Sequence, residues 1–325
     1  MVPSASDLRP REVPGLVADS VRLGLRAWRA RLGTLSAVVL AVVVMNLPGQ
    51  AAQWAASARM EEVSARVEAR GDRPAEPSEA LEDLSLMGPA CCWLCGSGCF
   101  TMLAVMPLTA GAVVAGARAV RGNARFSDLF CAFRRGRFLP TMLAVLVTVF
   151  IGGGAAVLVG VVSSVAVAGS ASRAISTLIT PAVMYAVVAV VAAVTLWLTA
   201  RLWFALVRVA DPDRPRIGGV DAVTQSWQWS AGPTQWRMLA LVLLVGAAFA
   251  AAFVPAGLVA GGALGDAGAV STVLATFLAV VAAWIGGTVW VAVLGAAYEL
   301  VAVRNEPIAP PVVHPRQDAE GAIDA

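Results

Sequence analysis

Six long stretches of this chain contain no charged residue, and this feature limits the possible folds more than any other. The stretches lie between Arg31 and Arg59, Asp83 and Arg118, Arg137 and Arg173, Arg173 and Arg201, Arg237 and Asp266, and Asp266 and Glu299. The shortest of them holds 27 residues, whereas a helix needs about 20 apolar residues to cross the hydrocarbon layer of a bilayer. Each stretch is therefore long enough to span a membrane.

Helices suit these stretches better than β-strands do. Inside lipid every backbone polar group must be paired within the protein, which only helices and closed barrels achieve. A barrel needs strands of about ten residues with alternating polarity, but residues 37–45 and 187–194 are apolar at every position. We predict an all-α, polytopic membrane helix bundle with six transmembrane helices, at about residues 34–54, 90–116, 139–166, 177–203, 238–262 and 270–298.

Composition and the two ends of the chain fit this prediction. Hydrophobic residues make up 58% and charged residues 14% of the sequence, whereas soluble domains carry about 25% charged residues. About thirty hydrophilic residues with six arginines precede the first apolar run, which is far longer than the start of an ordinary signal peptide. We expect a cytoplasmic segment at residues 1–33, a membrane domain at 34–302 and a disordered tail at 303–325 that contains the one histidine, His314.

The arginines predict the orientation of the spans. All 24 basic residues are arginine, and with the N-terminus inside, nineteen of them fall in cytoplasmic segments and five in external ones. Loops rich in arginine stay on the cytoplasmic side. The pattern therefore predicts both termini in the cytoplasm and the acidic segment from about residue 54 to 89 outside, as a loop in which Met60, Val63 and Val67 suggest a short amphipathic helix.

A pattern repeats three times along the chain. Trp28, Phe133 and Trp227 lie 105 and 94 residues apart, and each stands near the end of an amphipathic stretch that leads into an outgoing span. The spacing predicts three hairpins, each preceded by an interfacial amphipathic helix. The predicted interfacial anchors are Trp28, Phe133, Trp227 and Trp236, and the predicted contacts to lipid headgroups are Arg22, Arg26, Arg29, Arg134, Arg135, Arg137 and Arg237. Such helices either only anchor the spans or also recruit a lipid or a partner.

Four cysteines cluster near the external start of the second predicted span, at Cys91, Cys92, Cys95 and Cys99. Cys92, Cys95 and Cys99 share one helix face, where they could exchange electrons as thiols, form a disulfide or bind a metal. Cysteine is also a common small residue in helix packing. A relay usually needs a second cysteine pair, and a metal site usually draws on separated segments, so we predict no metal, cofactor or catalytic residue.

The centres of the predicted spans contain no ionisable residue, which argues against a proton or ion relay through the bilayer. Arg201 and Glu299 lie toward the cytoplasmic ends of their spans. Snorkelling to the interface or pairing with each other would satisfy these two charges. The basic residues stand beside spans rather than in one patch, so we expect membrane lipids and not nucleic acid as partners. The sequence leaves open whether the chain also binds a partner protein or forms a homo-oligomer.

Two segments resemble a known group of bacterial proteins. They are Arg121-Gly122-Asn123 through Phe126-Ser127-Asp128-Leu129-Phe130 with Phe133-Arg134-Arg135, and Ala222 to Trp227 with Gly232. They are similar to motifs in six-span families related to the membrane domain that precedes some glycerophosphoryl diester phosphodiesterases. In the fused relatives the hydrolytic chemistry belongs to a separate soluble domain, so the resemblance implies a membrane module and not phosphodiesterase activity.

Three functions are compatible with these observations. The first is a non-enzymatic membrane module in the cytoplasmic (inner) membrane of a bacterium, acting in envelope or lipid-related processes. The second is a small transporter or lipid-handling carrier that uses a cavity between the hairpins. The third is a thiol-dependent membrane oxidoreductase built on the cluster from Cys91 to Cys99.

Overall fold

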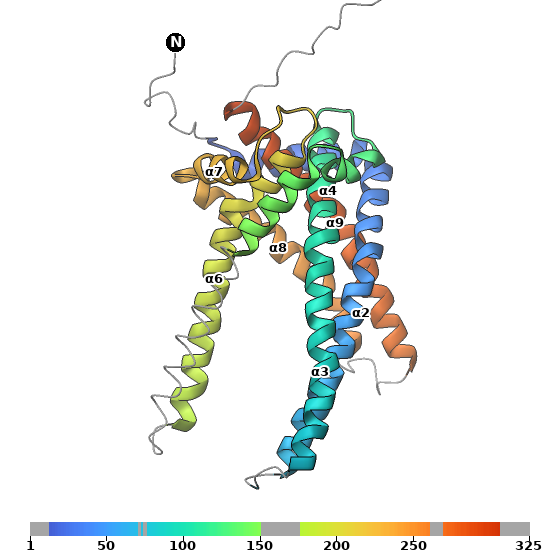
Figure 1. Cartoon of the computed structure of the whole chain (residues 1–325). Helices are drawn as coiled ribbons and strands as arrows, with labels where there is room; N and C mark the ends of the chain where they lie inside the picture. The colour runs from blue at the N-terminus through green and yellow to red at the C-terminus, as the bar shows by residue number, and fades with distance from the viewer. Residues whose placement is uncertain (1–12, 71–72, 74–76, 151–175, 261–268, 306–325) are drawn as a thin grey trace, which may run out of the picture.

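The computed structural model describes residues 13–70, 73, 77–150, 176–260 and 269–305, and all regular secondary structure within them is helical (Figure 1). The helices are α1 (Leu16–Ala30), α2 (Leu32–Arg70), α3 (Pro77–Phe100), η2 (Thr101–Val105), α4 (Met106–Val120), η3 (Phe126–Phe133), α6 (Ser176–Ala210), α7 (Gly219–Trp229), α8 (Pro233–Ala260) and α9 (Ala269–Asn305). A shorter apolar helix covers Phe138–Phe150. The all-α prediction is confirmed for these residues.

Five of the described helices are long and apolar enough to cross a membrane. They are Leu32–Arg70, Pro77–Val120, Ala193–Ala210, Pro233–Val259 and Val273–Asn305. Many of their large apolar side chains face outward, among them Leu244, Val254, Leu258 and Phe277. Such a surface would be costly in water, so these helices suit lipid as their solvent. The third predicted span, at 139–166, includes the helix Phe138–Phe150, and its remainder lies outside the described residues.

The first two long helices extend well beyond the lengths predicted for their spans. After residue 54, where an external loop with a short amphipathic helix was predicted, α2 continues without a break to Arg70, and α3 begins at Pro77. The two helices lie side by side (Figure 1). Ion pairs join their far ends, Arg66 with Glu82 and Arg70 with Asp83, and Arg66 also pairs with Glu62 within α2. The acidic residues Glu82 and Asp83 therefore hold α3 against α2 beyond the apolar part of the two helices.

Pro107 stands at a change of helical geometry. The turn before it, η2, is a π-helix, in which the Met106 N–H donates to the Thr101 carbonyl. Proline has no N–H to donate, and a wider turn accommodates the bond that is lost. The segment Pro77–Val120 is therefore one interrupted helix of 44 residues.

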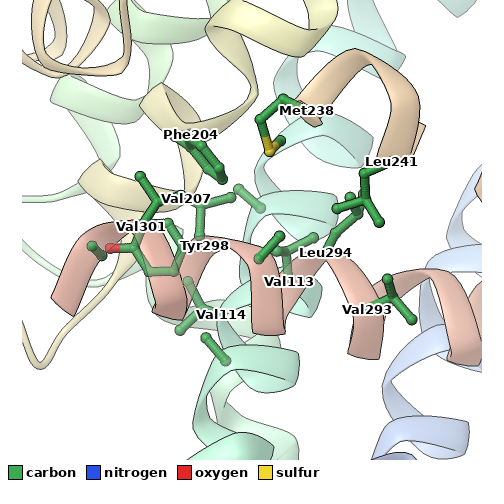
Figure 2. Close-up of a cluster of buried hydrophobic side chains, with 14 of the residues drawn as sticks. Val113, Val114, Phe204, Val207, Met238, Leu241, Val293, Leu294, Tyr298 and Val301 are labelled. Atoms are coloured by element: carbon green, nitrogen blue, oxygen red, sulfur yellow. The ribbon is translucent and has the colours of Figure 1, made fainter. Parts of the chain in front are cut away.

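The principal core lies where α4, α6, α8 and α9 meet. Figure 2 shows Val113 and Val114 of α4, Phe204 of α6 and Met238 of α8 around Tyr298 of α9. All of these side chains are fully buried. Small residues let α4 and α9 approach closely, because a Cβ added at Gly116 would lie 2.2 Å from the Val291 carbonyl oxygen. Backbone contact of this kind is typical of membrane helices.

The short helices gather at one end of the molecule, together with the loops between 121 and 137 and between 211 and 218 (Figure 1). We call this region the polar end. Helix α1 packs on α9, where a Cβ at Gly24 would lie 2.7 Å from the Val293 Cα atom. Where the sequence predicted an amphipathic helix at 126–133, η3 is a tighter 3₁₀-helix. Its buried residues are Asp128, Leu129, Cys131 and Ala132. The charge of Asp128 can be buried because it is paired with Arg118 inside the protein.

Candidate functional site

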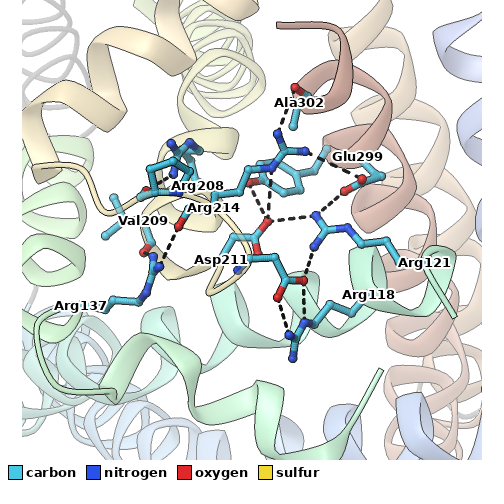
Figure 3. A network of polar contacts seen from close by, with 12 residues as sticks. Arg118, Arg121, Arg137, Arg208, Val209, Asp211, Arg214, Glu299 and Ala302 are labelled. Carbon is cyan, nitrogen blue, oxygen red and sulfur yellow. Dashed lines mark hydrogen bonds and ion pairs between the residues drawn. The ribbon is translucent and has the colours of Figure 1, made fainter. Parts of the chain in front are cut away.

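A cluster of charged side chains fills the polar end. We call it the ion network, and it consists of Arg118, Arg121, Asp128, Asp211, Asp213, Arg214 and Glu299. Its members come from α4, η3, the loop after α6, and α9. Figure 3 shows how Arg118, Arg121, Asp211, Arg214 and Glu299 lie. Asp128 and Asp211 are completely buried. A buried charge is tolerated only when it is paired and hydrogen-bonded, so the network fixes these segments relative to one another.

Arg118 connects η3 with the loop that follows α6. Its Nε donates to an Asp213 carboxylate oxygen at 3.0 Å, and its Nη1 donates to Asp128 at 2.5 Å. The second Asp128 oxygen accepts the Arg125 backbone N–H at 2.8 Å, which closes the first turn of η3. The two aspartates therefore hold one guanidinium group between them.

Arg121 lies at the centre of the network. Its guanidinium group donates to Asp213, to Asp211 at 3.0 Å, and to Glu299 of α9. The Tyr298 hydroxyl donates to the same Asp211 carboxylate at 3.1 Å. Arg121 thus joins the end of α4 to α9 and to the 211–214 loop, three segments that are distant in sequence.

The charges of the network shift the pKa values of its members. Burial alone would raise the pKa of the Asp213 carboxyl, but the hydrogen bonds and charges of Arg118 and Arg121 outweigh it, so this pKa lies below its ordinary value of 3.8. Burial also works against the charged form of Arg121, but its carboxylate partners outweigh that effect and raise the pKa of the guanidinium group. Both groups are therefore charged at neutral pH, as a structural ion network requires.

Arg137, predicted to contact lipid headgroups, is instead buried in the protein. Its guanidinium group donates to the carbonyls of Val209 at 2.7 Å and Arg214 at 2.9 Å, and burial lowers its pKa. The carbonyls at the end of α6 and in the following loop need donors, which is why this arginine turns inward. Arg237 also bonds within the protein, to the Val13 carbonyl at 3.0 Å. By contrast, Arg134 and Arg135 are exposed.

The predicted aromatic anchors have different surroundings. Trp236 is 64% exposed, and Phe133 is exposed and stacks on Phe138. The Trp28 indole N–H donates to the Thr288 hydroxyl at 3.0 Å and so connects α1 to α9. Trp227 lies beneath the Arg201 guanidinium group, 4.2 Å from the ring centre. Trp28 and Trp227 therefore make specific protein contacts.

Arg201 and Glu299 do not pair with each other, which was one of the two expectations for them. Arg201 donates to the Gln235 side chain at 2.9 Å, whereas Glu299 accepts from Arg121. The physical reason is that each charge has a nearer partner on a neighbouring segment.

The arginines of α1 differ from those of the ion network. Arg22, Arg26 and Arg29 are exposed. Within the part of the chain that the structure describes, none of these three side chains forms a hydrogen bond or an ion pair. Their guanidinium groups are thus available to a ligand outside the protein.

The thiols of Cys91, Cys92, Cys95 and Cys99 on α3 are free and exposed, and Cys131 is buried. Burial, aided by the charges of Asp211 and Asp128, raises the pKa of the Cys131 thiol to about 12. Among the described residues, no group of three or more histidine, cysteine, aspartate or glutamate side chains has a geometry suited to a metal ion. His314 lies outside those residues.

An apolar cavity of about 310 Å³ lies between α2, α4, α8 and α9. Its lining consists of Val39, Val42, Thr109, Ala112, Gly246, Phe249, Ala283, Gly287, Trp290 and Val291. The only hydroxyl in this lining, on Thr109, donates to the Val105 carbonyl at 2.8 Å. We call this space the central cavity. Its chemistry suits a hydrocarbon rather than a polar solute.

Comparison with known proteins adds no relative, because no family model, curated protein or solved structure matches this chain. The sequence reasoning missed the ion network, although one signal was present. Asp128, Asp211 and Asp213 are acidic residues in predicted cytoplasmic segments that otherwise carry mostly arginine. Acidic residues in such a setting indicate ion pairs.

Proposed function

We propose that this chain is a multi-pass protein of the bacterial cytoplasmic membrane that acts without catalysis as a lipid-binding module. In this proposal six spans form three hairpins, each preceded by an interfacial helix. The polar end faces the cytoplasm. The central cavity holds an acyl chain of a membrane lipid.

The distribution of charge supports this placement. The ion network and the exposed arginines of α1 and the 134–135 segment lie at the polar end. The short helices α1, η3 and α7 lie at that end as well, and each precedes an apolar helix. Arginine near a membrane surface favours the cytoplasmic side.

The resemblance to the membrane domain that precedes some glycerophosphoryl diester phosphodiesterases fits the same proposal. Arg121 and Asp128, which belong to the resembling segment, are members of the ion network. We infer that this segment acts as a structural support for the module rather than as a reactive site.

The central cavity is the observation that carries the lipid-binding role. Its lining is apolar, and it lies among helices suited to a bilayer. A cavity there is filled by the surrounding solvent, which is lipid. The free energy of binding would come from apolar contact, at about 0.8 kcal/mol for each buried methylene group.

A cavity-filling variant tests the role. Gly246 lines the cavity, and a Cβ added there meets no atom within 4 Å, so Gly246→Phe places a ring in the space without a backbone clash. Gly257→Phe is the matched control, because Gly257 lies three turns along the same face of α8, also with open space around it. Delipidated protein in detergent is titrated with dioleoylphosphatidylcholine and followed by native mass spectrometry.

We expect Gly246→Phe to weaken retention of the phosphatidylcholine about tenfold, the effect of losing contact with roughly two methylene groups. Gly257→Phe should bind like the wild type. Equal retention by Gly246→Phe and wild type would show that the cavity holds no acyl chain and would overturn the proposal.

One observation also favours a lipid-handling carrier. Phe249 lines both the central cavity and a second apolar groove on the other side of α8 and α9. Movement of this ring would connect the two spaces. Transfer of fluorescent phospholipid between the leaflets of proteoliposomes, faster with the protein than without it, would support the carrier.

A further inference from the structure

The second apolar groove lies between α1, α8 and α9, close to the polar end. It has a volume of about 410 Å³, and its lining includes Val21 and Leu25 of α1, Ala248 and Ala252 of α8, and Val289 of α9. We call it the α1 groove. Leu25 is 36% exposed at its edge.

Helix geometry places two unpaired arginines beside this edge. At 3.6 residues per turn, Arg29 and Arg22 lie about 40° and 60° around α1 from Leu25, whereas Arg26 lies about 100° away. Arg22 and Arg29 are about 10.5 Å apart along the helix axis. Arg22 lies almost one turn before Leu25 and Arg29 about one turn after it, both on the same side around the helix, so their long side chains can reach one anionic group between them. Arg26 lies one turn from each of them, beside the same position.

The groove and the arginines together match one kind of molecule. A groove with almost entirely apolar walls accepts an acyl chain, and guanidinium groups bind phosphate through parallel charged hydrogen bonds. We propose that the α1 groove is a binding site for an anionic phospholipid, with an acyl chain against Leu25 and Ala252 and the phosphate between Arg22 and Arg29. The inference rests on the proposed membrane placement and names the lipid class and the residues that recognise it.

The charge balance of the polar end supports this choice. The arginines of the ion network are paired with carboxylates or backbone carbonyls. Arg22 and Arg29 are not paired within the described residues, and the only acidic residue of α1, Asp19, stands in its first turn. Two arginines without an ion-pair partner, placed at the depth of the lipid headgroups, attract anionic lipid.

The experiment compares dioleoylphosphatidylglycerol with dioleoylphosphatidylcholine on the delipidated full chain, followed by native mass spectrometry. The test variant is Arg22→Ala with Arg29→Ala, and the control is Arg135→Ala, which removes an exposed arginine of the polar end outside α1. Ala252→Trp fills the groove and leaves all arginines in place. Circular dichroism confirms that each variant is helical before the titration.

We expect wild type and Arg135→Ala to prefer phosphatidylglycerol, and the double arginine variant to lose phosphatidylglycerol affinity roughly thirtyfold while it keeps its affinity for phosphatidylcholine. Ala252→Trp should weaken phosphatidylglycerol at this site, and millimolar glycerol 3-phosphate should not displace the lipid. An equal loss in Arg135→Ala, no loss in the double variant, or full displacement by glycerol 3-phosphate would overturn the inference. Those outcomes leave the Gly246→Phe test of the central cavity unaffected, so the two proposals fail separately.

Discussion

Arg121 donates a hydrogen bond to Glu299 across 178 residues of sequence, and this bond joins the end of α4 to α9. The Arg121 side chain is 12% exposed and the Glu299 side chain is 10% exposed. Because both charges are largely shielded from water, each depends on the other for its solvation. The pair therefore contributes to the arrangement of the helices around the polar end.

Removal of one partner should be strongly destabilising. Arg121→Ala leaves the charges of Glu299, Asp211 and Asp213 without a shared partner, and loss of one member of a buried pair costs about 3–5 kcal/mol. We expect a clear fall in the unfolding midpoint, measured by circular dichroism in detergent. Arg135→Ala, which removes an exposed arginine, should change it little. Equal midpoints for the two variants would show that the ion network does not stabilise the fold.

At the crossing of α4 and α9, Gly116→Ala should change the free energy of unfolding in the opposite direction from Gly96→Ala on α3. Gly116→Ala would place a Cβ 2.2 Å from the Val291 carbonyl oxygen, whereas at Gly96 of α3 an added Cβ meets nothing within 4 Å. We expect Gly116→Ala to lower the free energy of unfolding by about 1–3 kcal/mol. Gly96→Ala should leave it unchanged or raise it by up to about 1 kcal/mol, because alanine favours helix over glycine. A stabilising effect at Gly116 would contradict the close contact of α4 and α9.

Acid should weaken the polar end through Asp213. Its pKa in the folded protein lies below the ordinary value of 3.8, so the folded state binds fewer protons than the unfolded state as the pH falls. The stabilising contribution is complete above the ordinary pKa and is lost as the pH drops through the lower, folded pKa. Unfolding midpoints between pH 7 and pH 3 should fall more steeply for wild type than for Asp213→Asn, which starts lower. Parallel curves would contradict this role.

Cys131 should be chemically inert in the folded protein. Its thiol is buried and its pKa is about 12, so almost no reactive thiolate is present at neutral pH. We expect N-ethylmaleimide to modify Cys131 only after unfolding, as measured by peptide mass spectrometry. Ser127→Cys, an exposed position in the same short helix, should react in the folded protein. Modification of Cys131 at a similar rate would contradict its burial.

The cluster on α3 allows a direct test of the thiol-enzyme alternative. Cys92→Ser with Cys95→Ser removes the C-x-x-C pair, whose exposed side chains make no disulfide. We expect stability and lipid binding to be unchanged, because no other described part of the site depends on these thiols. Loss of a measurable thiol-exchange activity in this variant would favour the oxidoreductase instead.

The sequence predicted the helical class and most apolar segments well, because uncharged runs as long as that before Arg118 have few alternatives in lipid. It could not predict the ion network. The pairing of Arg121 with Glu299 depends on how α4 crosses α9, and that crossing depends on contacts such as those of Gly116 and Gly295, which composition does not reveal. For the same reason Arg137 resembled a surface arginine by sequence and is buried in the structure.

The length of the first helix pair also escaped the sequence reasoning. The charged residues between Arg59 and Asp83 indicated a loop with only a short helix, but pairs such as Arg66 with Glu62 stabilise a longer helix outside the apolar segment. Hydropathy marks where lipid ends, and a helix can continue past that boundary.

The central claim is that the polar end and the α2–α3 turn lie on opposite sides of a membrane, with the polar end inside. The most direct measurement uses Ser127→Cys and Ser78→Cys, two exposed serines on η3 and at the start of α3, each in a chain whose five cysteines are replaced by serine or alanine. Intact bacterial spheroplasts are treated with a membrane-impermeant maleimide before and after permeabilisation. We expect Ser78→Cys to be labelled in intact cells and Ser127→Cys only after permeabilisation. Labelling of both positions from the same side would contradict the account.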